Sequence, residues 1–326
     1  MHGLGDSVRF IGVAAVNLHQ GFEPLTIRAA DQTPTGTVQR VTRIDAHHHL
    51  WDLSQTEQAW LQGPAMAPIH RTFSVADLAP EAAAAGIDRS VLVQVLPDVG
   101  ETRGFLALAA ESDLVAGVVG WADLTGADFA DMLAGLRAGP GGELLLGIRH
   151  LVQGEADPRW LCRPDVLRAL GVLADAGLRY DLLTLPHQLP AAIEAVRTLP
   201  QLTFVLDHLS KPPIASGELE PWATSVRELA AEPNVYCKLS GMVTEADYQS
   251  WTVESLRPYA ETVLDSFGPE RLMFGSDWPV CLLAASYAEV TDAAEQLVSE
   301  LSKDEQAEVF GGTAARAYRL AVPTTD

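Results

Sequence analysis

The chain has 326 residues, 48% of them hydrophobic, which is enough to build one large core. It carries 43 acidic and 22 basic residues, a net charge of −21. A surface this acidic repels phosphate backbones and anionic lipid headgroups, so we expect neither nucleic-acid nor membrane partners. The three cysteines, Cys162, Cys237 and Cys281, lie far apart without C-x-x-C spacing. Their spacing argues against a disulfide framework and favours the cytoplasm.

The first forty residues differ from the rest of the chain. Residues 1–40 show no hydrophobic period, and we expect an N-terminal arm that is disordered or dispensable. Residues 41–326 are expected to form one domain. From residue 43 onward, short apolar runs predict strands at 44–49, 90–96, 115–121, 144–150, 179–185, 203–209, 235–241 and 272–278. Ala- and Leu-rich stretches predict helices at 74–86, 101–112, 126–138, 164–177, 188–199, 219–232, 247–266, 286–301 and 303–320.

This alternation is typical of an α/β protein with a closed parallel sheet, a (β/α)8 TIM barrel. Gly86, Gly177 and Gly268 stand where predicted helices end, and Pro164 stands where one begins. A doubly wound open sheet is the rival fold, but no glycine-rich phosphate turn follows the first predicted strand. The sequence therefore favours the barrel.

Histidines gather at one end of the predicted barrel. Of nine histidines, six lie at or just beyond predicted strand C-termini: His47, His48, His49, His150, His187 and His208. In a barrel this rim carries the catalytic groups, because the βα loops lie there. The clustering therefore predicts an active site at the strand C-termini.

The first predicted strand ends in IDAHHH at 44–49. Strand side chains alternate, so His47 and His49 share one face while His48 points the other way. Two imidazoles at this spacing can converge on one ion or one substrate oxygen. An isolated H-x-H in a loop would be a surface feature, but the end of a buried strand argues against that alternative.

Three further polar side chains follow buried strands. His208 ends the sixth predicted strand and Asp277 the eighth, while His187 lies just past the fifth. A histidine or carboxylate there is costly to bury unless it is paired or coordinating. For Asp277 the alternative is a helix cap, which the following Pro279 argues against. For His187 an ordinary loop histidine and a site residue are equally open.

Two cations and two tryptophans adjoin these motifs. Arg149 ends the fourth predicted strand and Lys238 lies on the seventh, where a cation can bind a substrate carboxylate or hydroxyl. Trp51 and Trp278 can wall a substrate pocket or simply pack under loops. The alternative for the cations is a structural ion pair with a nearby carboxylate, of which the strands offer Asp45, Asp181 and Asp207.

The pattern of strand ends resembles the amidohydrolase superfamily. It combines a first-strand H-x-H, a histidine after strand five, a histidine ending strand six and an aspartate ending strand eight. The phrases GIRH at 147–150, PHQL at 186–189, DHLSKP at 207–212 and KLSG at 238–241 resemble the sugar-lactone and pyrone-dicarboxylate lactonases of that superfamily. The resemblance covers about residues 43–320.

The resemblance also bears on metal content. Binuclear members of the superfamily bridge two metals through a carboxylated lysine on strand four, but here that strand has no lysine and the first lysine of the chain is Lys211. The resemblance therefore implies one divalent metal, with zinc favoured, or none. A bound metal would take as ligands His47, His49, His187 and Asp277, with His208 beside them.

The implied activity is a hydrolase of carbohydrate metabolism that opens a sugar lactone or related cyclic ester. Asp277 is expected to be the general base, with His208 beside it as a second catalytic residue. The histidines would hold the oxyanion. The expected substrate contacts are Arg149, His187, Lys238, Trp51 and Trp278.

Two alternatives stay open at this point. One is a mononuclear zinc-dependent decarboxylase of the same fold, and the other is a non-catalytic sugar-binding barrel. An amidase or phosphoesterase is disfavoured because the bridging lysine is missing. The sequence leaves a homo-oligomer open.

Overall fold

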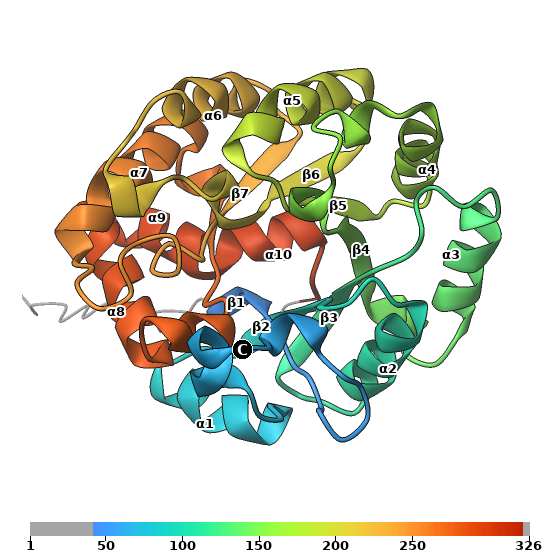
Figure 1. Cartoon of the computed structure of the whole chain (residues 1–326), viewed down its shortest axis with the longest axis horizontal. Coiled ribbons are helices and arrows are strands. Elements are labelled where there is room, and N and C mark those ends of the chain that lie inside the picture. The colour runs from blue at the N-terminus through green and yellow to red at the C-terminus, as the bar shows by residue number, and fades with distance from the viewer. Residues whose placement is uncertain (1–41, 322–326) are drawn as a thin grey trace, which may run out of the picture. The chain divides into compact units, whose positions relative to one another are not determined.

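The computed structural model describes residues 42–321. The predicted arm, residues 1–40, and the domain boundary after it lie outside the described residues. The eight strands form one parallel sheet in which each strand pairs with the next along the chain (Figure 1). They are β1 (Ile44–His48), β2 (Arg89–Val93), β3 (Val115–Gly120), β4 (Leu145–His150), β5 (Arg179–Leu182), β6 (Thr203–Leu206), β7 (Val235–Leu239) and β8 (Leu272–Phe274).

The first and last strands meet just beyond their C-terminal ends. The Asp277 backbone N–H donates to the His47 carbonyl at 2.8 Å, and the His49 N–H donates to the Trp278 carbonyl at 2.7 Å. These bonds close the sheet into a ring, so the predicted (β/α)8 barrel is confirmed. They also place the ends of β1 and β8, which carry the most polar motifs, directly side by side.

Eight helices follow the strands and lie outside the ring (Figure 1). They are α1 (Val75–Ala84), α2 (Val99–Ala110), α3 (Phe129–Ala138), α4 (Pro164–Asp175), α5 (Leu189–Thr198), α6 (Trp222–Ala230), α7 (Val253–Phe267) and α8 (Tyr287–Leu297). In the described part of the chain, none of the helices is both long and apolar enough to cross a membrane.

Helix α4 illustrates why these segments are helical. Pro164 occupies its first turn, where the missing N–H costs nothing. Gly177 follows its end with a φ of 70°, a left-handed conformation that glycine adopts without a steric penalty. Its buried residues recur at i, i+3, i+4 and i+7 and so form one stripe against the barrel: Val166, Ala169, Leu170 and Leu173.

The predicted last helix, 303–320, is interrupted. A π-helical turn, Glu308–Gly312, separates α9 (Lys303–Ala307) from α10 (Thr313–Tyr318). Ala314, Ala317 and Tyr318 of α10 pack with the interior side chains Ile44 and Met273. Because Ile44 begins β1 and the Arg179 side chain at the start of β5 bonds the Ala317 carbonyl, α10 closes the barrel at the strand N-termini.

Several strands are shorter at their C-terminal ends than the sequence predicts. β6 stops at Leu206 and β8 at Phe274. Beyond them the backbone leaves the extended region, since His208 has a φ of 50° and Asp277 a φ of 57°. Positive φ is uncommon for residues other than glycine and is often found at functional sites. The predicted C-terminal boundaries of these two strands were therefore too late, and the residues beyond the observed ends belong to the loops that carry the polar side chains.

Candidate active site

A cavity of about 520 Å³ opens at the C-terminal ends of the strands. Polar groups at its wall include His49, Arg149 and His208. Most of the remaining wall is apolar and comes from the βα loops: Trp51, Ala59, Trp60, Met66, Val95, Leu96, Pro97, Leu151, Leu183, Val280 and Leu283. A mostly apolar cavity with a few convergent polar groups is the usual form of a small-molecule site.

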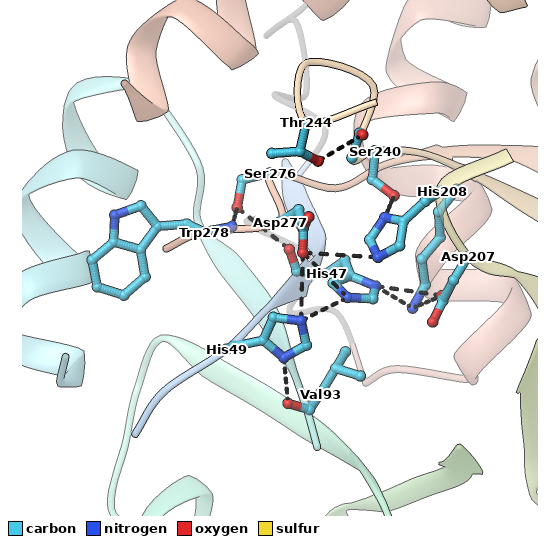
Figure 2. A network of polar contacts seen from close by, with 12 residues as sticks. His47, His49, Val93, Asp207, His208, Ser240, Thr244, Ser276, Asp277 and Trp278 are labelled. Carbon is cyan, nitrogen blue, oxygen red and sulfur yellow. Dashed lines mark hydrogen bonds and ion pairs between the residues drawn. The ribbon is translucent and has the colours of Figure 1, made fainter. Parts of the chain in front are cut away.

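His47 and His49 face each other on the cavity side of β1, as predicted from alternation. Their Nε2 atoms are 3.1 Å apart, and His49 Nδ1 lies 2.8 Å from the Val93 carbonyl (Figure 2). The carbonyl can only accept, so His49 Nδ1 carries a proton. His48 points away and contacts the Ser90 hydroxyl at 3.0 Å.

Asp277 faces the three imidazoles. Its Oδ1 lies 3.4 Å from His49 Nε2, 3.7 Å from His47 Nε2 and 3.8 Å from His208 Nε2 (Figure 2). Burial by itself raises the pKa of Asp277, but the positive charge that His208 carries when protonated at low pH and the hydrogen bond of His49 oppose it, and the net effect lowers the pKa. Asp277 therefore remains a carboxylate that can bind a metal or accept a proton.

His208 reaches the site through an unusual turn. Residues 208–211 all have φ between 50° and 59°, and this left-handed turn directs the His208 ring toward Asp277. His208 Nδ1 lies 2.8 Å from the Ser240 hydroxyl. Burial lowers the pKa of His208 to about 4, so the ring is neutral at neutral pH.

Gly241 leaves room for the His208 ring. A Cβ at this position would lie 2.5 Å from His208 Nδ1, and the Gly241 φ is +64°. We therefore expect Gly241→Ala to displace the ring and to lower turnover roughly 100-fold, the scale of a misplacement of about 1 Å. The measurement is kcat together with melting temperature.

Gly217→Ala is the matched control, because Gly217 has a φ of +72° but nothing within 4 Å of its Cβ position. It should carry a similar backbone cost and keep full turnover. Equal turnover of the two variants would contradict a role for the His208 position.

The two predicted cations have different surroundings. Arg149 lines the cavity, and its guanidinium bonds Gln94 and lies 3.0 Å from Asp207. Lys238 is fully buried below His47 and does not line the cavity. Its partners are Asp181 at 2.6 Å and Asp207 at 2.9 Å, so for Lys238 the structure shows the ion-pair alternative.

Two other predicted contacts are not brought to the cavity. His187 is exposed in the short helix Pro186–Gln188, and neither group of potential metal ligands in the described residues includes it. The reason is the inward side chain of Gln188, which donates to the Val152 carbonyl and turns its neighbour outward. Trp278 packs edge-on against Phe73 and does not line the cavity, whereas Trp51 does.

Sequence reasoning missed much of the cavity wall. Lys211, which ends the left-handed turn, pairs with Glu245 at 3.0 Å, and both line the cavity. Lys211 belongs to the DHLSKP phrase at 207–212, so the family resemblance could have identified it as a site residue. Trp60 lies in the short 3-10 helix Ala59–Leu61 and Tyr248 lies in a loop. Neither segment has hydrophobic periodicity, and nothing in the local sequence marks these two residues.

Residues 44–320 match the family model described as Amidohydrolase. The chain belongs to this amidohydrolase family. A curated L-fucono-1,5-lactonase from Burkholderia ambifaria is 40% identical over 288 residues, which cover 87% of this chain and 98% of that protein. A second one, from Burkholderia multivorans, is 39% identical over 292 residues, with 86% and 97% covered.

A solved structure of an amidohydrolase from Burkholderia multivorans, with bound zinc, has a TM-score of 0.81 and 39% identity. The match covers 86% of this chain and 99% of that one. Because its family and its curated relatives are hydrolases, this chain is an enzyme of the hydrolase class.

Two groups of side chains in this amidohydrolase could hold a metal ion. In the first, His47, His49 and Asp277, the ligand atoms lie 3.1 to 3.7 Å apart. Ligands about 2.1 Å from a tetrahedral zinc are roughly 3.4 Å from one another, so these side chains fit. The second group, which combines His47 and His208 with Asp207, fits less well because Arg149 and Lys238 already engage that carboxylate.

Proposed function

We propose that this amidohydrolase opens a lactone of a sugar acid by hydrolysis. The observation that carries the proposal is the ionised Asp277 carboxylate, held beside the neutral His208 imidazole and next to a cavity of about 520 Å³. The names of the two curated relatives, both L-fucono-1,5-lactonases, favour a lactone over the decarboxylase and sugar-binding alternatives. The apolar wall at Trp60 and Met66 suits the methyl group of a 6-deoxy sugar lactone.

In the proposed reaction, Asp277 takes a proton from the attacking water as the new bond forms to the lactone carbonyl carbon. The tetrahedral oxyanion is stabilised by the Arg149 guanidinium, an N–H donor at the wall of the same cavity. The acyl–oxygen bond then breaks, and the ring oxygen takes the proton to leave as a hydroxyl group. The product is a hydroxy acid.

We also propose at most one metal, held by His47, His49 and Asp277. The bound zinc in the structurally similar protein supports zinc as the ion, and a zinc ion would polarise the lactone carbonyl. The missing strand-four lysine supports a single site. The three free thiols, at Cys162, Cys237 and Cys281, support a cytoplasmic location. The names of the two curated relatives support a role in carbohydrate metabolism.

The test is a panel of sugar lactones in a pH-indicator assay, each measured with and without chelator. We expect turnover of at least one 6-deoxy sugar lactone well above the spontaneous rate and above the rate with Asp277→Asn protein. Elemental analysis should find no more than one equivalent of metal per chain. Absence of lactone turnover together with release of carbon dioxide from an aromatic acid would overturn the proposal.

A further inference from the structure

Two basic side chains lie among the described residues that line the cavity, Arg149 and Lys211. Arg149 Nη1 lies 3.0 Å from Asp207 Oδ2, and its charge is thereby paired. Lys211 Nζ lies 3.0 Å from Glu245 Oε1, and Glu245 lines the cavity as well. At the described wall, therefore, no Arg or Lys charge lacks a carboxylate partner.

The Arg149 guanidinium is held in a buried group of balanced charge. Its Nε donates to the Gln94 side chain at 2.9 Å, and its Nη2 donates to the Gln94 carbonyl at 2.5 Å. Its partner Asp207 also pairs with Lys238, which pairs in turn with Asp181. Two cations thus face two carboxylates. Arg149 can donate an N–H to the reacting carbonyl, but the group adds no net charge that would attract a second anion.

Lys211 and Glu245 come from different loops whose backbones are joined. Lys211 ends the left-handed turn after β6, where its N–H donates to the His208 carbonyl at 2.7 Å. Glu245 lies after β7, and its N–H donates to the Met242 carbonyl at 3.2 Å. The Glu245 carbonyl accepts from the Ala215 N–H at 3.0 Å, and Ala215 follows Lys211 in the segment before α6. The backbone therefore holds the two side chains within reach of each other before a substrate binds.

The Lys211–Glu245 pair has opposite consequences for charged and uncharged lactones. A substrate carboxylate that enters the cavity loses hydration, and it finds the Lys211 ammonium already paired. It also meets the negative charges of Glu245 and, beside the cavity, Asp277, which repel it. The hydroxyl groups of an uncharged sugar lactone can bond either member of the pair, because a carboxylate accepts and an ammonium donates.

We propose that Glu245 is a specificity-determining residue that cancels the charge of Lys211, so that the cavity takes uncharged polyhydroxy lactones and rejects lactones that carry a carboxylate. The inference rests on the proposed lactone hydrolysis and narrows its substrate class. Removal of the Glu245 carboxylate leaves Lys211 as an unpaired cation at the wall. The two side chains are 24% and 23% exposed, so this change should not prevent folding.

The test compares two sugar lactones with the same ring and hydroxyl groups, one with a methyl group at the exocyclic carbon and the other with a carboxylate. For the wild-type protein, kcat/KM should be roughly 100-fold higher on the methyl lactone, the scale of a like-charge contact. Glu245→Gln should raise kcat/KM on the carboxylated lactone roughly tenfold or more, the scale of one freed charge at a partly screened site. The gain should appear in KM. The proteins are compared at equal metal content and after a check of melting temperature.

Glu254→Gln is the matched control, because it changes the net charge by the same amount. Glu254 pairs with Arg257 on the surface of α7, and its loss should leave the preference between the two lactones unchanged. The double variant Lys211→Met, Glu245→Gln removes the freed cation and should lose the gain. A gain that persists in the double variant, an equal gain in Glu254→Gln, or no gain in Glu245→Gln would overturn the proposal.

A binding measurement separates this inference from the proposed function. Glutarate, a dicarboxylate, should bind to Glu245→Gln roughly tenfold more tightly than to the wild-type protein or the double variant, as measured by calorimetry. This measurement uses no lactone. Tighter binding in a protein that hydrolyses no lactone would refute the proposed function and leave the charge cancellation by Glu245 standing. Equal glutarate affinity in the three proteins would overturn the inference even where lactones are hydrolysed.

Discussion

Asp277→Asn should lower turnover by roughly two to four orders of magnitude, the scale of lost general-base catalysis. The amide keeps the shape of the carboxylate and one acceptor oxygen, but it cannot take a proton from water. Folding should survive, because the Asp277 backbone N–H still joins β8 to β1. Removal of a buried charge can even raise the melting temperature. The measurements are kcat and KM on a lactone that the wild-type protein hydrolyses, together with melting temperature.

Glu245→Gln is the control for Asp277→Asn, because Glu245 is another carboxylate at the wall of the same cavity and pairs with Lys211. Its loss should act mainly on KM. Bound metal is measured in each variant, since Asp277 is also a proposed ligand. An Asp277→Asn protein that is folded and nearly fully active would remove this residue from the mechanism and leave His208 as the candidate base.

Asp207→Asn should destabilise the fold by about 3–5 kcal/mol, the usual cost of breaking a buried ion pair from one side. Asp207 is fully buried and lies within 3.0 Å of both Arg149 and Lys238. The asparagine retains the volume of the side chain but removes its charge. Arg149 then loses its ion-pair partner, and Lys238 keeps only Asp181. For a domain of this size the melting temperature should fall by roughly 10 °C. Thermal unfolding at neutral pH measures the effect.

Asp165→Asn is the matched control for Asp207→Asn. Asp165 pairs with Arg163 at 2.6 Å, but that pair lies at the surface. Solvent screens exposed pairs, so the melting temperature should hardly change. A similar small change in both variants would show that the Asp207 pair contributes little and that Arg149 and Lys238 find other partners.

The sequence by itself was sufficient for the architecture and for the centre of the site. The alternation of short apolar runs with longer Ala- and Leu-rich stretches predicts the order of strands and helices, because strands buried on both faces form short apolar runs and helices need longer segments. Strand alternation likewise predicts that His47 and His49 share a face. Asp277 was predictable as well, since the carboxyl ends of parallel strands meet at one rim of a barrel.

The tertiary structure alone decided how the remaining side chains point. Alternation from the interior residue Val205 places Asp207 inside and His208 outside, but the left-handed turn at 208–211 brings the His208 ring back into the site. His187 turns outward because Gln188 takes the inward position. Lys238 finds its acceptors on β1, β5 and the loop after β6, which no local pattern links. Such contacts join residues far apart in the chain, whereas sequence periodicity reports only on near neighbours.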